Sequence, residues 1–239
     1  MTWVIGTSRV EQKITLQDGH LLMTSFRNKL SDSEYRDRWL DPDQIRLQVD
    51  GVDTRSLSWN WTFLDEKTQR LSQGELQLDI RVRSGPLEVT KHWLIYPKTA
   101  IIREWMTIGN VSGEGVRLRN LFFLNTRDLW GKTDDLELSY ISGGGNFNGS
   151  QLLKTEKLHQ GYSRTFDSNV GVQTGNYSAY LPLLLIGNPQ SRESVAIGWD
   201  YMGHWSLQVD DQAGKQVGIS IEVAGYDGLL QPGSRIESP

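Results

Sequence analysis

Alternation of apolar and polar residues with a period of two is the sequence feature that most restricts the fold. Between Leu76 and Val82, apolar side chains alternate with Gln77, Asp79 and Arg81, as in a strand with one face in a core and the other in solvent. This pattern predicts an all-β protein. Comparable segments cover residues 10–17, 20–27, 45–49, 87–96, 100–110, 116–126 and 217–223.

Turn residues separate these segments at short intervals. Asp18-Gly19 joins two alternating segments and Asp50-Gly51 follows a third, and both pairs are typical of two-residue hairpin turns. Turns repeated about every 8–12 residues indicate a sandwich or a barrel. The chain of 239 residues is long enough for one large β domain. We expect long loops where the alternation weakens, at residues 29–44, 142–150 and 160–178.

Composition excludes several classes of function. The net charge is −4 with no run of one sign, so we expect no nucleic-acid partner. The chain has no cysteine, which excludes disulfides, zinc–thiolate sites and thiol catalysis. No signal peptide and no apolar run near 18 residues is present, so we expect no membrane partner and a cytoplasmic location. The four histidines have no metal-ligand spacing, and we expect neither a metal nor a cofactor.

The segment from Tyr180 to Val209 carries the main functional signal. It predicts two buried strands joined by a turn, followed by a glycine-containing loop. Aromatic rings beside a carboxylate suit a sugar, because ring faces cover the apolar face of a pyranose and the carboxylate accepts hydrogen bonds from its hydroxyls. For each tryptophan, core packing is the alternative role. The predicted carbohydrate-binding residues of this loop are Trp199, Asp200, Tyr201, His204 and Trp205.

A second candidate platform is Trp59-Asn60-Trp61. If this tripeptide is in a strand, Trp59 and Trp61 lie on one face. They form either a sugar platform or part of the core. Acidic pairs such as Asp210-Asp211 are interpreted as turn residues. His92 is predicted in a strand, and nothing in the sequence pairs it with His204 as mutarotase acid–base chemistry requires.

The last hundred residues resemble a known family. Residues 178–185 and 196–205, followed by the terminal Pro-Gly-Ser-Arg-Ile-Glu-Ser-Pro at 232–239, resemble the N-terminal β-supersandwich domain of family 36 glycoside hydrolases, the α-galactosidase or melibiase group. The resemblance implies a large antiparallel β-sandwich related to galactose mutarotase. It also implies that residues 1–239 form one domain that precedes a (β/α)8 catalytic barrel absent from this chain.

In that family the catalytic aspartates belong to the barrel, so the resemblance implies a non-catalytic domain. Such a domain packs on the barrel, helps to shape the glycan site and can build homo-oligomer contacts. The implied partners are an oligosaccharide or glycoside and the C-terminal barrel of the same parent chain. The implied glycan contacts are Trp199, Asp200 and Trp205, with Trp59 and Trp61. Two alternatives stay open: a stand-alone, lectin-like carbohydrate-binding domain, and a mutarotase-like epimerase with two histidines and an acid in one cleft.

Overall fold

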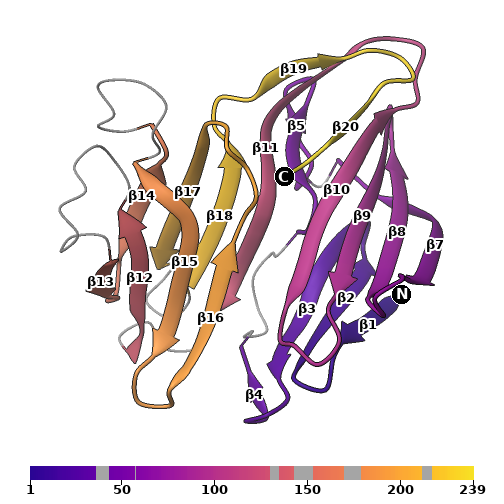
Figure 1. The fold of residues 1–239 in the computed structure, drawn as a ribbon. Coiled ribbons are helices and arrows are strands. Elements are labelled where there is room, and N and C mark those ends of the chain that lie inside the picture. Colours follow the sequence, from indigo (N-terminus) through magenta and orange to yellow (C-terminus); the bar gives the residue numbers. More distant parts are fainter. Residues whose placement is uncertain (36–42, 57, 130–134, 143–152, 170–178, 212–216) are drawn as a thin grey trace.

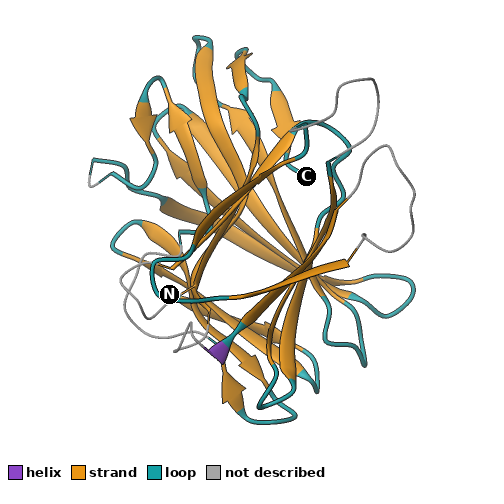
Figure 2. Ribbon diagram, turned by 90° about the vertical axis from the view of Figure 1, so that its left-hand side faces the viewer, coloured by secondary structure: helices purple, strands orange, loops and turns teal. Residues whose placement is uncertain are grey.

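The computed structural model describes residues 1–35, 43–56, 58–129, 135–142, 153–169, 179–211 and 217–239. In this part of the chain, antiparallel strands form four sheets (Figure 1). Figure 2 shows that strands make up most of the described chain. The predicted all-β, antiparallel sandwich is confirmed.

Two of the sheets come mainly from the first half of the chain. The N-terminal sheet has the order β1-β2-β3-β4, with β1 (Thr2–Gly6), β2 (Val10–Gln17), β3 (His20–Asn28) and β4 (Ser33–Glu34). The five-stranded sheet has the order β20-β10-β9-β8-β7, with β7 (Thr62–Arg70), β8 (Leu76–Ser84), β9 (Leu87–Ile95), β10 (Ile102–Asn110) and β20 (Arg235–Glu237).

The other two sheets contain most of the second half. The seven-stranded sheet has the path β14-β17-β18-β11-β5-β6, with β19 also paired to β11. Its strands are β5 (Arg46–Val49), β6 (Val52–Asp53), β11 (Val116–Leu129), β14 (Ser163–Asp167), β17 (Trp205–Asp211), β18 (Val217–Val223) and β19 (Asp227–Leu230). The β15 sheet has the order β13-β12-β15-β16, with β12 (Glu137–Ser142), β13 (Leu153–Lys157), β15 (Tyr180–Asn188) and β16 (Glu193–Gly198).

Two hydrophobic cores lie between these sheets. The first core joins the N-terminal and five-stranded sheets to the β5 side of the seven-stranded sheet. The second core joins the β15 sheet to β14, β17 and β18. Strand β11 contributes to both, because Leu118 and Leu121 lie in the first core and Phe123 in the second. Figure 1 accordingly shows β11 between the β15 sheet and the five-stranded sheet.

The hairpin turns follow the predicted residues. Asp18 and Gly19 have φ values of 50° and 77°, and Asp50 and Gly51 have 48° and 87°, as a type I′ turn requires. Gly19 also permits a close approach, because a Cβ there would lie 2.5 Å from Oδ1 of Asn60. The Trp61 N–H donates to the Gly19 carbonyl at 2.7 Å. The tip of the β2–β3 hairpin thus holds the segment that precedes β7.

Four local expectations are wrong. Residues 163–167 form strand β14 inside a stretch predicted to be a loop. Asp210 and Asp211 end strand β17 instead of forming a turn, and the Asp211 carboxylate accepts the Gly161 N–H at 2.8 Å. Trp59 and Trp61 precede β7, so they do not share a strand face. Strand β15 is buried on one face only, and strand β16 has one half-buried and one exposed face. Residues 143–150 of the predicted glycine-rich loop lie outside the described chain.

Candidate functional site

The predicted aromatic loop, Trp199–His204, connects β16 to β17 and is held at both ends. The Trp199 N–H donates to the Pro182 carbonyl at 3.2 Å, and the Ala224 N–H donates to the His204 carbonyl at 2.9 Å. Within the loop, a Cβ on Gly203 would lie 2.4 Å from the ring of Tyr201. A glycine at 203 therefore allows the Tyr201 ring to lie across the loop backbone.

The aromatic side chains form the buried base of the loop. Trp205 is only 2% exposed, and Trp199 packs edge-on against it, with ring centroids 4.7 Å apart. Tyr201 contacts Phe123 edge-on at 6.3 Å. The Trp199 Nε1–H is buried and has no hydrogen-bond partner among the described residues. Trp205 is thus a core residue here, while Trp199 and Tyr201 are half-buried at the margin of the second core.

Polar groups and one apolar side chain form the exposed part of the loop. Asp200 is exposed and makes no hydrogen bond or ion pair with the rest of the described chain. Met202 beside it is 94% exposed. Nε2 of His204 lies 2.8 Å from Oδ1 of Asp167 on β14. The loop therefore presents an exposed carboxylate and a positioned imidazole above a packed aromatic base.

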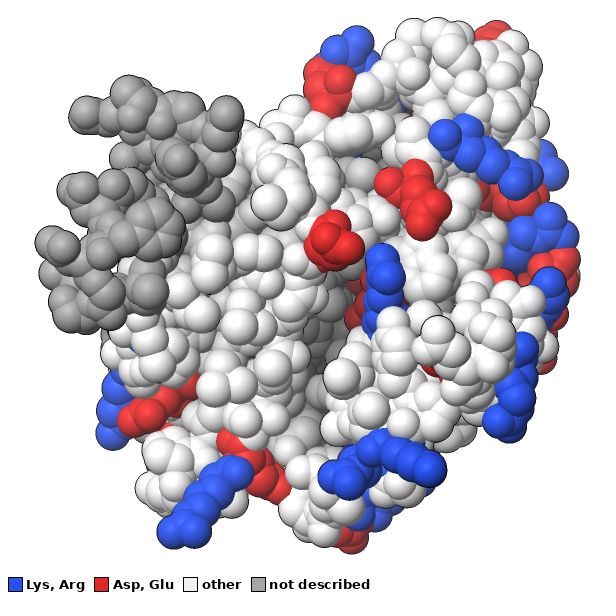
Figure 3. All heavy atoms as spheres, viewed as in Figure 1, with Lys and Arg blue, Asp and Glu red and all other residues white. Residues whose placement is uncertain are grey.

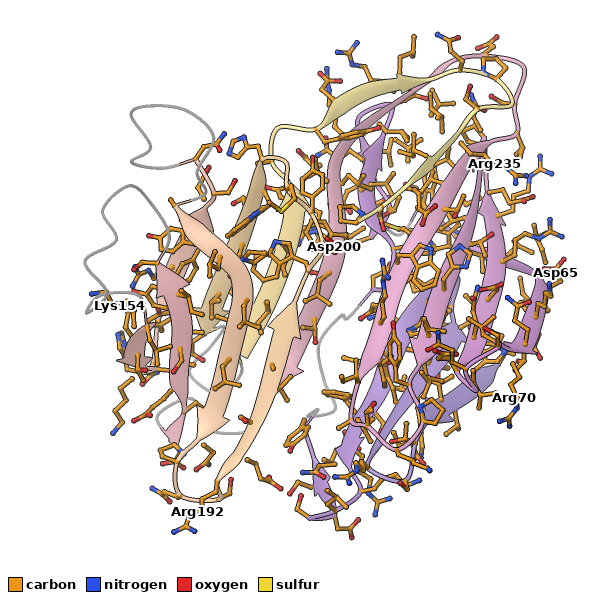
Figure 4. All side chains as sticks on the ribbon, in the orientation of Figure 1. Asp65, Arg70, Lys154, Arg192, Asp200 and Arg235 are labelled. Carbon is orange, nitrogen blue, oxygen red and sulfur yellow. The ribbon has the colours of Figure 1, made fainter. Side chains whose placement is uncertain are left out.

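The pictures place the loop at the middle of the molecule. Figure 4 shows the label of Asp200 between the β15 sheet and the five-stranded sheet. In the same view, Figure 3 shows the surface hollowed between these two halves. A loop in this position can contact a ligand or a neighbouring domain that approaches the hollow.

The second predicted platform lies elsewhere. Trp61 is 2% exposed and belongs to the first core. Trp59 is half-buried against the same core, with its ring 5.7 Å from that of Trp61. Both indole N–H groups are buried without a hydrogen-bond partner in the described chain. The structure does not bring this pair to the loop at residues 199–204, whose rings pack on the second core.

The histidines are also kept apart. His92 lies on β9 of the five-stranded sheet, where Nδ1 is 2.7 Å from Asp79 Oδ1 and Nε2 is 3.0 Å from Thr107 Oγ1. His204 precedes β17 of the seven-stranded sheet. Each imidazole thus has its own carboxylate partner on its own sheet. Among the described residues, no group of three or more histidine or acidic side chains could hold a metal ion.

Sequence reasoning missed a half-buried carboxylate on the seven-stranded sheet. Glu222 faces away from the second core, and burial raises its pKa, an effect that the nearby Arg46 guanidinium partly offsets. Arg46 lies 3.7 Å over the ring of Phe122. The sheet register brings β5, β11 and β18 side by side. These strands are far apart in the sequence, so no local pattern signals the cluster.

Comparison with known proteins finds similarity in the fold. The sequence matches no protein-family model and no curated protein. The structure is similar to the family 36 α-galactosidase AgaA of Geobacillus stearothermophilus, with a TM-score of 0.75 at 14% identity over 100% of this chain and 40% of that one. Variants of AgaA have been solved with raffinose and with stachyose. An α-galactosidase of Lactobacillus brevis gives 0.76 at 13% identity, over 100% and 38%.

The chain therefore spans about 40% of the length of the α-galactosidases it matches. A putative aldose 1-epimerase of Escherichia coli is also similar, with a TM-score of 0.52 at 11% identity over 99% of this chain and 96% of that one. The resemblance to family 36 enzymes inferred from the sequence is confirmed at the level of the fold. No helix in the described part has the length and apolar character needed to cross a membrane.

Proposed function

We propose that residues 1–239 are the non-catalytic N-terminal domain of an α-galactosidase-like glycoside hydrolase. The observation that supports this most is the match of the whole chain to about 40% of the two family 36 α-galactosidases described above. Glycoside hydrolysis needs two carboxylates that flank the scissile bond, and we assign them to a (β/α)8 barrel in the rest of the protein. The domain packs on that barrel and helps to shape its glycan site.

The loop Trp199–His204 is our candidate for the contact with the glycan. Its exposed Asp200 carboxylate can accept hydrogen bonds from sugar hydroxyls, and the half-exposed rings of Trp199 and Tyr201 can cover apolar C–H groups. Trp205 supports the Trp199 ring from the core, and Phe123 contacts the Tyr201 ring. A base that is already packed lowers the entropy cost of ordering the loop on binding.

The test compares this chain with a longer protein that continues in the same reading frame. We expect the longer protein to hydrolyse raffinose and the 239-residue chain to be inactive. In the longer protein, Asp200→Asn removes a hydrogen-bonding charge, so KM should rise roughly five- to tenfold while kcat stays within about twofold. Glu114→Gln, on the exposed turn between β10 and β11, is the matched control and should change neither constant.

The lectin-like alternative gives a different result. It predicts saturable glycan binding by the 239-residue chain, lost in Asp200→Asn, and no hydrolysis by the longer protein. That combination would overturn the proposal.

One observation favours a second candidate function. The similar epimerase is covered over 96% of its length, so this fold also occurs as a nearly complete protein. Mutarotation of D-galactose, followed by polarimetry, tests this reading with the chain as it is. We expect no catalysis, because His92 and His204 lie on different sheets. Activity that disappears in His204→Gln would establish the epimerase instead.

A further inference from the structure

A pocket of about 330 Å³ lies at one end of the solvent-facing side of the five-stranded sheet. Its floor consists of Glu88 and Thr90 on β9 with Thr107 on β10, and Arg235 on β20 borders it. This volume is at the lower end of the range for small-molecule sites. Figure 4 shows Arg235 at the upper end of this sheet, well separated from Asp200. The pocket is thus distinct from the loop at residues 199–204.

Gly109 leaves room for the Arg235 side chain beside the pocket. Across the sheet, Glu88, Gly109 and Arg235 are register partners in one row. A Cβ at Gly109 would lie 3.3 Å from Cγ of Arg235, so the arginine stem crosses the bare backbone of Gly109. The guanidinium then lies beside the pocket, and it makes no hydrogen bond or ion pair with the described residues. Arg235 is therefore a hydrogen-bond donor at the pocket wall with no partner in the described part of the chain.

A hydrogen-bonded relay orients the Thr107 hydroxyl. The Asp79 carboxylate accepts from Nδ1–H of His92 at 2.7 Å. Nε2 of His92 lies 3.0 Å from Oγ1 of Thr107, within hydrogen-bond distance of the hydroxyl. Trp105 stacks on His92 at 4.8 Å and 16° and fixes the ring. The contact with His92 fixes the position of the Thr107 hydroxyl, which can accept a hydrogen bond from a ligand in the pocket or donate one to it.

The lining of the pocket therefore offers both hydrogen-bond acceptors and hydrogen-bond donors. Glu88 is a second acceptor, and one of its oxygens lies 3.2 Å from Nη1 of Arg81. Arg235 can only donate. An anionic ligand needs donors alone and would meet the Glu88 carboxylate. A ligand with hydroxyl groups can donate to Glu88 and Thr107 and accept from Arg235.

We propose that this pocket binds one neutral sugar ring, as a second glycan contact that goes beyond the function proposed above. Among the described residues, no tryptophan, tyrosine or phenylalanine lines it, so we expect the sugar ring to be recognised by its hydroxyl edge. Binding here does not depend on the loop at residues 199–204. The site would give a longer glycan two points of attachment on the same domain.

Titration of the 239-residue chain with D-galactose, observed by saturation-transfer NMR, tests the proposal. We expect saturable binding that weakens roughly five- to tenfold in Thr107→Val and at least roughly tenfold in Arg235→Gln, since charged hydrogen bonds are the stronger kind. Thr68→Val and Arg70→Gln, on β7 of the same sheet, are the matched controls and should retain wild-type affinity. Gly109→Val should fill the pocket and abolish binding.

Three outcomes would overturn the proposal. One is an absence of saturable binding. Another is unchanged affinity in both pocket variants, which would place the sugar elsewhere. The third is tighter, Arg235-dependent binding of inorganic phosphate, which would make this an anion site. If Asp200→Ala abolishes galactose binding while Thr107→Val and Arg235→Gln retain wild-type affinity, the sugar binds at the loop and not in the pocket. That result would overturn the pocket proposal and leave the proposed function of the domain standing.

Discussion

Lys91 and Glu104 form an ion pair on the core side of the five-stranded sheet. Nζ of Lys91 lies 3.0 Å from a Glu104 oxygen, and the lysine side chain is only 2% exposed. Alternation along β9 places Lys91 on the same face as Val89 and Trp93, so its charge has little access to water. The pair therefore lies where removing one partner leaves an uncompensated buried charge.

Lys91→Ala should accordingly lower the free energy of unfolding by about 3–5 kcal/mol, measured by urea denaturation. The double variant Lys91→Met with Glu104→Leu should recover most of this loss, because well-packed apolar residues often replace a buried pair without cost. A single variant that loses under about 1 kcal/mol would show that the charge of Glu104 is already well solvated.

Glu222 gives a stability effect with a defined pH dependence. Burial raises the pKa of this carboxyl in the folded state above its unfolded value, with Arg46 partly opposing the shift. The folded protein then binds the proton more tightly, so this contribution to stability is present at low pH and is lost as pH rises through the raised pKa. Glu222→Gln should therefore be more stable than wild type near pH 8, and this advantage should shrink or reverse below pH 4.

Thermal unfolding of both proteins across this pH range measures the effect. A stability difference that does not change with pH would contradict the assignment of the raised pKa to Glu222. Asp65→Asn on the exposed edge strand β7 is a control that should change little.

Among the elements, the hairpins were the most predictable from the sequence. Their sequence signals are local: an Asp-Gly pair at the turn and alternation over eight or nine residues in each strand. The structure confirms the turns, because both residues of each pair have positive φ. Local patterns could not identify β14, because its short segment alternates weakly and is completed by pairing with β17. Nor could they place Trp61, whose backbone N–H is held by the carbonyl of the distant Gly19.

The candidate site was predictable in part for the same reason. A loop between two strands was evident at residues 199–204, but which of its rings are buried depends on the sheet packed beneath them. Trp205 continues the inward face of β17 with Leu207 and Val209. The pocket beside Arg235 was not predictable, because β9, β10 and β20 meet only through the sheet register.

The outward face of β15 is apolar and exposed, although the sequence predicted a buried strand. Leu181, Leu183 and Leu185 are 46%, 44% and 39% exposed. Leu183 and Leu185 pair with Gly198 and Ala196 of β16, so the apolar surface is two strands wide. Such patches favour association of the isolated domain.

Leu183→Lys should therefore reduce concentration-dependent light scattering while changing Tm by less than about 2 °C, as expected for a surface substitution. Leu184→Lys is the matched contrast, because its side chain is 1% exposed and faces the second core. That variant should unfold or aggregate. Equal behaviour of the two variants would contradict the observed orientation of β15.

At the scale of the whole molecule, the two cores are physically coupled. Strand β11 runs through both, and Phe26 and Val223 pack against each of them. Loss of either core would expose part of β11 and remove support from the other. We therefore expect residues 1–239 to unfold as one cooperative unit, although the core is divided.

Calorimetry with one substitution in each core tests this coupling. Ile14 in the first core and Ile219 in the second are at most 1% exposed, and truncating either to alanine should cost about 2–5 kcal/mol. In a single unit, Ile14→Ala and Ile219→Ala should each shift the one transition down by roughly 5–15 °C, with calorimetric and van't Hoff enthalpies equal. Two independent units would instead give two transitions, and each substitution would move only one of them.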